Sequence, residues 1–303
     1  MAFTAKDVQA LREKTGCGMM DCKKALVETN GDMDAAADYL REKGLASQAK
    51  KAGRIAAEGT VCAIIENGIG AVVELNAETD FVAGGEEFKA LALEVAKIVA
   101  EQNPADLDAL LKCAKNGQTV EEMVQELFLK VRENIKVRRF ERYEGKVVTY
   151  VHAGGKIGVM VKFDTALDAD NADFITMGKN IAMQIAAMNP GYLDEASVPA
   201  EVIEKEKAIL IAQMKEDPKM ANKPDAVLGK IVEGKIGKFY KENCLVDQQY
   251  VIDSELTVGK YVEKTAKELG SDIKIASFVR FEKGEGIEKR VDDFAAEVAS
   301  MIK

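Results

Sequence analysis

Few side chains in this sequence have the types and spacing needed for acid-base, metal or nucleophilic chemistry. There is a single histidine, His152, although histidine is the commonest general base and a frequent metal ligand. Asp168, Asp170 and Asp173 are close together but lack the glycine and distal glutamate of a calcium loop. No phosphate-binding GxxxxGKS or GxxxxGKT loop occurs. The sequence therefore predicts no catalytic residues, no metal site and no cofactor, and hence a protein that is not an enzyme.

The cysteines also lack a pattern that would support chemistry. They are odd in number and contain no CxxC pair: Cys17, Cys22, Cys62, Cys113 and Cys244. Cys17 and Cys22 are close, but no second pair and no histidine lie nearby to complete a zinc shell. We expect free, buried thiols rather than a disulfide framework.

The most distinctive candidate site is the loop Thr79-Asp80-Phe81-Val82, which follows a strand-like run and precedes two glycines. Burying Phe81 would draw the carboxylate of Asp80 out of water without a partner. Two interpretations are open. Phe81 lies under its own helix, which Asp80 caps, or Phe81 inserts into an apolar cleft of another protein while Asp80 meets polar or cationic groups there.

An internal repeat predicts the elements that position this loop. Residues 58–76 and 144–164 each begin with Glu-Gly-x-Val, turn at glycine and return through Ile-Gly. Each is followed by a helix-like stretch that ends in Asn-Pro. The connections between strand and helix differ, AETDFVAGG in the first copy and TALDADN in the second. Because matching positions mostly report packing, we expect a specific function at the divergent loop.

The sequence outside the repeat predicts further helices and one more strand. Residues 105–143 are interpreted as helical material, and the strand-like run 275–281 is expected to complete the second sheet. Net charge is −9 and the isoelectric point about 5.0, which argues against general nucleic-acid binding. No apolar run has the roughly 20 residues of a membrane span. The N-terminus shows no secretion signal. A cytoplasmic location is expected, or a compartment reached after removal of a leader.

These patterns together predict an α+β fold in several parts. We expect a three-helix domain over 1–44, a linker over 45–57, a core N-subdomain over 58–143, a core C-subdomain over 144–197 and 247–283, an antiparallel helical hairpin over 198–246, and a C-terminal module with a helix over 284–303. Both core subdomains should carry antiparallel sheets. The third helix should end at Gly44. The hairpin has one apolar stripe on each helix, so it packs on the core or forms a homodimer with a second molecule.

The first three helices resemble the ubiquitin-associated (UBA) fold, with Met19 and Met20 at the corner between two of them. The two methionines either fill gaps in the core or present soft, adaptable side chains to a partner.

Three stretches together resemble bacterial translation elongation factor Ts: LREKTGCGMMDCKKAL, NAETDFVA and FVRFEKGEGIEKRVDDFAAEV. The resemblance covers essentially the whole chain, and this order and spacing are highly specific. It implies a guanine-nucleotide exchange factor that binds elongation factor Tu in its GDP form and promotes GDP release during translation elongation. In the family, the Asp-Phe pair enters the GTPase beside its magnesium and phosphate-binding region. Magnesium offsets the repulsion between diphosphate oxygens. Displacing the groups that hold the ion therefore weakens GDP binding.

The resemblance also implies roles for individual residues. The inserted element would be Thr79, Asp80, Phe81 and Val82. Matching family positions imply further partner contacts from Arg12, Met19, Met20, Lys23, His152 and the strand region around Val251. The basic pair Arg138 and Arg139 is assigned to internal ion pairs. The terminal helix, Phe294 to Met301, resembles the module that contacts the GTPase.

Two other classes of function are considered. The first 44 residues alone suggest a UBA-type protein-binding adaptor without exchange activity, although a fold does not carry a function. A metal-dependent hydrolase would have to use Glu78, Asp80 and the acidic residues of 168–173. The lack of histidine and of paired metal-ligand spacing argues against such an enzyme.

Overall fold

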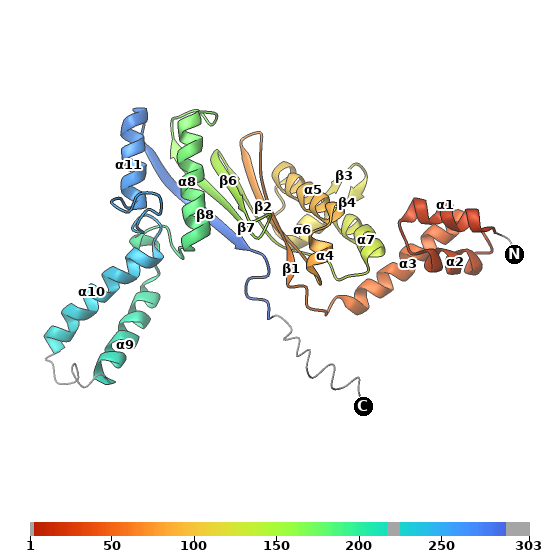
Figure 1. Cartoon of the computed structure of the whole chain (residues 1–303), viewed down its shortest axis with the longest axis horizontal. Coiled ribbons are helices and arrows are strands. Elements are labelled where there is room, and N and C mark those ends of the chain that lie inside the picture. Colours follow the sequence, from red (N-terminus) through yellow and green to blue (C-terminus); the bar gives the residue numbers. More distant parts are fainter. Residues whose placement is uncertain (1–2, 217–224, 289–303) are drawn as a thin grey trace.

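The computed structural model describes residues 3–216 and 225–288 as an α+β protein, with N-terminal helices, small antiparallel sheets and further helical segments (Figure 1). The predicted turn of the hairpin near Asp217 and the predicted terminal helix from Phe294 to Met301 lie outside these residues. Among the helices in the described ranges, none is long and apolar enough to cross a membrane.

Three helices form the N-terminal bundle: α1 (Ala5–Thr15), α2 (Met19–Glu28) and α3 (Met33–Lys51). Thr4 and Asp7 form the predicted capping box at the start of α1, and Gly16 ends this helix with a φ of 67°. Leu11 and Leu26 are fully buried in the bundle core. The bundle thus buries the apolar positions expected from helical spacing.

The third helix extends beyond its predicted end at Gly44 and continues to Lys51. Gly44 has a different role, because a Cβ atom there would lie 2.0 Å from Leu129 Cδ2 of α7 (Val120–Val131). The glycine permits close approach of α3 to α7 instead of ending the helix. The bundle is therefore docked on α7.

The first repeat unit contains β1 (Glu58–Glu66) and β2 (Ile69–Ala77), with the one-turn helix α4 (Asp80–Ala83) between β2 and α5 (Glu86–Gln102). Its antiparallel sheet has the order β1-β2-β5, in which β5 is Lys136–Glu144. Helix α5 covers this sheet and buries a row of apolar side chains that includes Phe88, Val95 and Val99. The core of this unit lies directly beneath the candidate loop.

Residues 105–143 were expected to be helical, and this prediction was wrong for the last part. The segment contains α6 (Leu107–Lys112), short strands β3 (Ala114–Lys115) and β4 (Gln118–Thr119), α7, and the strand β5 (Lys136–Glu144). In β5, Val137 pairs with Leu75 and Phe140 with Val73. The many basic residues of β5 obscure these apolar positions. Opposite Glu74 and Leu75 the register shifts by one residue, Arg138, which interrupts strict alternation along β5.

The second repeat unit contains β6 (Lys146–His152), β7 (Ile157–Thr165) and α8 (Ala172–Met188). Strand β8 (Ile273–Glu282) completes its antiparallel sheet in the order β6-β7-β8, as predicted from the strand-like run. Helix α8 covers this sheet, and α11 (Val258–Leu269) packs beside it (Figure 1).

The two sheets pack against each other through a small apolar cluster, with α5 and α8 on the outer faces (Figure 1). The glycine of each repeated Ile-Gly pair lies in this contact. A Cβ at Gly70 would lie 2.6 Å from side-chain atoms of Val147 and Met160, and a Cβ at Gly158 would lie 2.3 Å from Val61. Gly70 and Gly158 occupy matching places in the two units. The repeated motif therefore reflects close approach of the sheets rather than a binding site.

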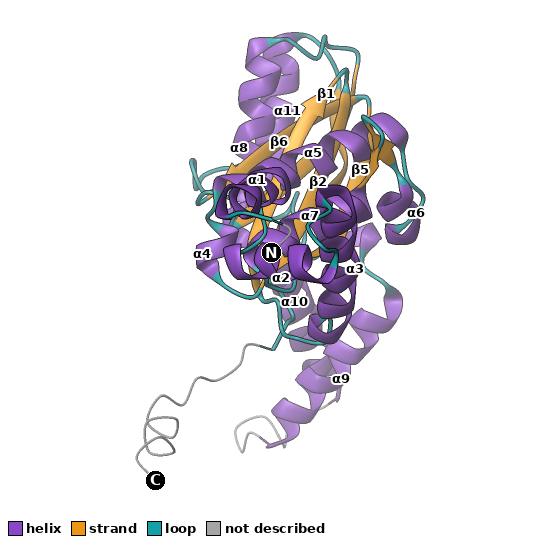
Figure 2. Ribbon diagram, turned by 90° about the vertical axis from the view of Figure 1, so that its right-hand side faces the viewer, coloured by secondary structure: helices purple, strands orange, loops and turns teal. Residues whose placement is uncertain are grey.

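The helical hairpin is formed by α9 (Ala200–Glu216), which follows the 3₁₀ turn η1 (Glu195–Ser197), and α10 (Asp225–Asn243). The two helices share an apolar cluster that includes Ile203, Leu210 and Val232. They project away from the sheets (Figure 2). Each helix thus buries its stripe against the other, as its sequence pattern requires.

Candidate functional site

The candidate loop folds as the N-cap and single turn of α4. Thr79 is the N-cap residue, with an extended backbone, and its hydroxyl accepts a hydrogen bond from the Val82 amide at 3.3 Å. Val82 and Ala83 are buried in the core of the first unit, whereas Asp80 is exposed and Phe81 is 88 % exposed. Successive residues of a helix are about 100° apart, so burial of one pair directs the preceding pair outward.

This geometry excludes one of the two interpretations made from the sequence. Phe81 does not lie under its own helix, and Thr79 rather than Asp80 provides the cap. The reason is that Val82 and Ala83 are the residues of this turn that pack into the core of the first unit. Phe81 is the most exposed of the exposed large apolar side chains among the described residues.

Two carboxylates hold the exit of β2 in place. Glu133 accepts hydrogen bonds from the Thr79 amide at 3.0 Å and from the Thr79 hydroxyl at 2.7 Å. Glu78 accepts from the Asn134 amide at 2.7 Å and pairs with Arg54 at 3.3 Å. Hydrogen bonds to an ionised acceptor are stronger than neutral ones. Asp80 and Phe81 are therefore presented from a fixed base.

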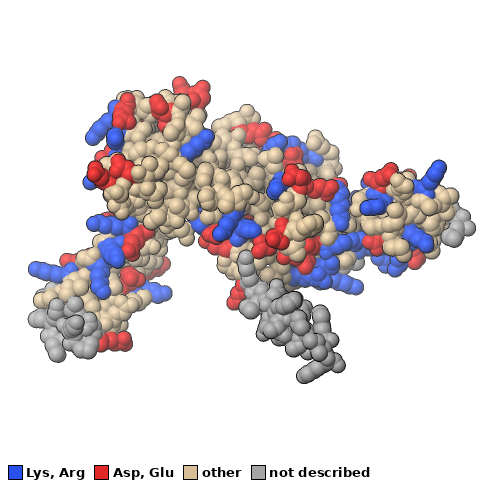
Figure 3. All heavy atoms as spheres, viewed as in Figure 1, with Lys and Arg blue, Asp and Glu red and all other residues tan. Residues whose placement is uncertain are grey.

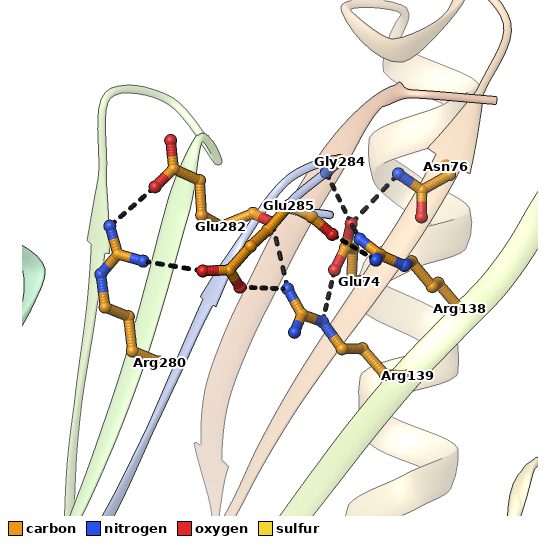
Figure 4. A network of polar contacts seen from close by, with 8 residues as sticks. All are labelled: Glu74, Asn76, Arg138, Arg139, Arg280, Glu282, Gly284 and Glu285. Carbon is orange, nitrogen blue, oxygen red and sulfur yellow. Dashed lines mark hydrogen bonds and ion pairs between the residues drawn. The ribbon is translucent and has the colours of Figure 1, made fainter. Parts of the chain in front are cut away.

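A buried charge cluster on β2 ties a distant part of the chain to the same strand (Figure 4). Glu74 is fully buried and accepts from Arg138 at 2.9 Å, from Arg139 at 2.6 Å and from the Gly284 amide at 2.8 Å. This confirms the internal assignment of the two arginines. Burial alone would raise the pKa of Glu74, but these three donors outweigh it and lower the pKa below its usual value. Arg139 also pairs with Glu285 at 3.1 Å.

The predicted contact residues of the bundle all lie on its surface. Met19 is 43 % and Met20 73 % exposed, so neither fills a gap in the core, and Arg12 and Lys23 are exposed. The bundle is placed to one side of the sheets (Figure 1). The structure does not place these residues next to the loop Thr79–Val82. They form a separate part of the accessible surface.

The predicted contacts of the second unit lie at two further places. His152 is exposed at the end of β6, and its Nδ1 lies 2.9 Å from the Tyr150 hydroxyl. The strand expected around Val251 was wrong, because Val251 lies in the loop between α10 and α11. Its side chain is 50 % exposed, and its amide donates to Gln184 Oε1 at 2.9 Å.

The remaining candidates for chemistry do not assemble into a site. Within the described ranges, no group of three or more histidine, cysteine, aspartate or glutamate side chains is arranged to hold a metal ion. Asp168, Asp170 and Asp173 are exposed at the junction of β7 and α8. All five cysteines are free; three are buried, and Cys62 and Cys113 are partly buried.

Basic and acidic side chains both occur over the face of the protein shown in Figure 3, and basic ones gather where the bundle meets the core. Two basic residues, one at the end of α3 and one shortly after it, are engaged internally. Lys51 donates to the Arg132 carbonyl at 2.5 Å, and Arg54 pairs with Glu78. They contribute to holding the bundle and the loop together.

Glu133 and Asn134 belong to the site but carry no sequence signal. They are 54 and 56 residues from their partners, Thr79 and Glu78, and follow an ordinary amphipathic helix. Only the position of α7 beside β2 brings them together.

An exposed phenylalanine on a fixed loop, over a two-sheet scaffold, is typical of a surface that binds another protein. Comparison with known proteins agrees. Residues 78–285 match the family model "Elongation factor TS".

Curated relatives called elongation factor Ts match nearly the whole chain. That of Clostridium perfringens (strain SM101 / Type A) is 50 % identical over 305 residues, covering 99 % of each chain. That of Syntrophotalea carbinolica is 48 % identical over 308 residues, covering 100 % of each, and that of Symbiobacterium thermophilum is 50 % identical over 304 residues, covering 98 % and 97 %. The chain belongs to the elongation factor Ts family, non-catalytic nucleotide exchange factors for elongation factor Tu in translation elongation.

Proposed function

We propose that the loop Thr79–Val82 is the element with which this exchange factor binds elongation factor Tu·GDP and perturbs its magnesium and phosphate site. One observation carries the proposal: Phe81 is 88 % exposed while the next two residues anchor the loop in the core. Burying a phenylalanine side chain in a partner would contribute roughly 1.5–3 kcal/mol. Asp80 would meet polar or cationic groups of the partner beside that cleft.

The action on GDP is indirect. Magnesium in the partner offsets the repulsion between the diphosphate oxygens, so disturbing the groups that support it weakens GDP without breaking a covalent bond. Linkage makes the effect reciprocal: bound GDP weakens the binding of the factor to the GTPase by the same ratio. Each tenfold of this coupling is about 1.4 kcal/mol. The factor must therefore bind the empty GTPase tightly, which requires a broad interface as well as Phe81.

The other parts of that interface are proposed to be separate surface patches. On the bundle, which resembles a UBA fold, the contacts would be Arg12, Met19, Met20 and Lys23. On the second unit they would be His152 and Val251. All six are exposed, and they lie on different elements from the loop. Truncating Met20 should raise the half-saturating factor concentration and leave the maximal rate of GDP release nearly unchanged.

We also propose the domain division expected from the sequence and a homodimer through the hairpin. Among the described residues of the hairpin, the large aliphatic side chains of Ile209, Ile211 and Val227 are exposed. A dimer that uses them should dissociate when Ile209 is replaced by glutamate, as measured by sedimentation velocity. A monomeric native protein would contradict this arrangement. Because the partner acts in translation, the location proposed is the cytoplasm.

The test is release of a fluorescent GDP analogue from purified elongation factor Tu with magnesium present. Rates are compared without factor, with the native protein and with Phe81→Ala. The control is Ile65→Ala, which truncates another exposed apolar side chain of the same unit. We expect the native protein and the control to accelerate release and Phe81→Ala to lose most of the effect.

A second arm of the experiment removes magnesium with a chelator. If the loop acts on the groups that hold the ion, the difference in GDP release rate between the native protein and Phe81→Ala should become smaller without magnesium. Acceleration that survives Phe81→Ala in magnesium would retain the exchange function but move its mechanism to other contacts.

A further inference from the structure

Three consecutive residues at the end of α7 contact three different parts of the molecule. Arg132 ends the helix with a φ of 59°, and its guanidinium donates to Asp21 Oδ2 of α2 at 2.7 Å. Its carbonyl accepts from Lys51 at the end of α3. Glu133 and Asn134 hold the exit of β2. The segment therefore joins the bundle, the start of the linker and the candidate loop.

The bonds between this segment and the exit of β2 are reciprocal. The Glu133 carboxylate accepts from the Thr79 amide, and the Glu78 carboxylate accepts from the Asn134 amide. Asn134 is 3 % exposed, and its side-chain amide donates to the Arg54 carbonyl at 2.7 Å. Each segment thus uses a carboxylate to hold a backbone N–H of the other, which fixes their relative position.

The contact with Thr79 also bears on the direction of α4. The hydroxyl that donates to Glu133 accepts from the Val82 amide, and one hydroxyl has the proton and lone pairs for both bonds. With the Thr79 amide held by the same carboxylate, neither the cap nor its backbone can rotate freely. Glu133 thereby sets the direction in which α4 leaves β2, and with it the direction of Phe81.

We propose that Glu133 is a positioning residue for nucleotide exchange, which pre-orients Phe81 without itself contacting the partner's nucleotide site. The inference rests on the proposed function of the loop. A loop held in its binding conformation loses little freedom on insertion, whereas a loop released from Glu133 must be ordered in each complex. The contacts proposed for the bundle and for the second unit lie on other elements and should stay intact when Glu133 is removed. The loss should therefore fall on the maximal rate and not on the half-saturating concentration.

The experiment measures GDP release from elongation factor Tu over a series of factor concentrations. Glu133→Ala should lower the maximal rate about tenfold, equivalent to about 1.4 kcal/mol, with less than about a twofold change in half-saturating concentration. Glu133→Gln should be intermediate, because a neutral amide oxygen still accepts from the Thr79 amide but forms a weaker bond. Glu121→Ala removes an exposed carboxylate from the first turn of α7, the helix that precedes Glu133, and should behave as the native protein.

Phe81→Ala, run in parallel, separates the two proposals. If Phe81→Ala accelerates GDP release as fast as the native protein does, the proposed function of the loop itself is contradicted. Loss with Phe81→Ala but full activity with Glu133→Ala would overturn only the positioning role. A slower rate that merely follows a lower melting temperature, or a loss confined to the half-saturating concentration, would also overturn it. If Glu133→Ala does not fold, Glu133→Gln and Thr79→Val carry the test, and native maximal rates in both would contradict the inference.

Discussion

The two repeat units place the same elements in the same order but differ where the second strand meets its helix. In the first unit this junction contains the helix α4, capped by Thr79 and held by Glu133. In the second unit residues 166–171 form no helix, and Asn171 caps α8 directly by accepting from the Phe174 amide at 2.9 Å. A shared scaffold can thus carry a presented side chain in one copy and a plain connection in the other.

The insertion between helix and third strand explains part of this difference. In the first unit that insertion contains α7, whose end lies against the junction. In the second unit the corresponding insertion contains the hairpin and α11, and α11 packs on α8 and β8. Neighbouring insertions, and not the repeat itself, therefore decide whether a junction can present a residue in a fixed direction.

The largest effect is expected from a matched strand position where the first unit has a fully buried charge and the second unit a partly buried one. Glu74 of β2 corresponds to Lys162 of β7, which is only partly buried. Glu74→Ala leaves two arginines without their shared carboxylate and should lower the free energy of unfolding by about 3–5 kcal/mol. Lys162→Ala should lower it by less than about 0.5 kcal/mol. Urea denaturation of both variants checks this, and equal effects would show that the two positions are equivalent after all.

The interface between the sheets should show the opposite behaviour, with matched effects in the two units. Gly70→Ala and Gly158→Ala each force a Cβ against side chains of the other sheet, and each should cost about 1–3 kcal/mol of unfolding free energy. Gly237→Ala, on α10 with open space around it, should be neutral or stabilising by up to about 1 kcal/mol. Thermal unfolding measures all three. A large cost in only one unit would refute the symmetric contact.

A smaller effect is expected in the pH dependence of stability. The pKa of Glu74 is lowered in the folded protein, so its contribution is fully present above the pKa of the unfolded chain. It is lost as pH falls from that value through the folded pKa. The free energy of unfolding should therefore decline in acid, and Glu74→Gln should have a shallower slope there. Urea denaturation at several acidic pH values tests this, and parallel slopes would contradict the lowered pKa.

Local patterns in the sequence predicted local structure well. The repeat predicted both sheet-and-helix units, the run 275–281 predicted β8, and Thr4 with Asp7 predicted the start of α1. Errors arose where tertiary contacts override local pattern. Gly44 lies inside α3 because Leu129 packs against it, and β5 is a strand because it pairs with β2.

The candidate site was predictable only in part, for the same reason. The contrast between the two junctions identified the loop, and the Asp-Phe pair within it. Its support could not be identified, since Glu133 meets Thr79 from 54 residues away, and Glu74 meets Gly284 from 210 residues away. Such contacts depend on the packing of whole elements and leave no mark in a local window of sequence.

We propose that the first junction acts on the nucleotide and the second does not. The most direct measurement is GDP release from elongation factor Tu at saturating factor, comparing Asp80→Ala/Phe81→Ala with Asp168→Ala/Asp170→Ala. The first variant should accelerate GDP release about 100-fold less than the native protein, equivalent to about 2.7 kcal/mol. The second variant should match the native protein. Equal losses in both, or full activity in the first, would contradict the account.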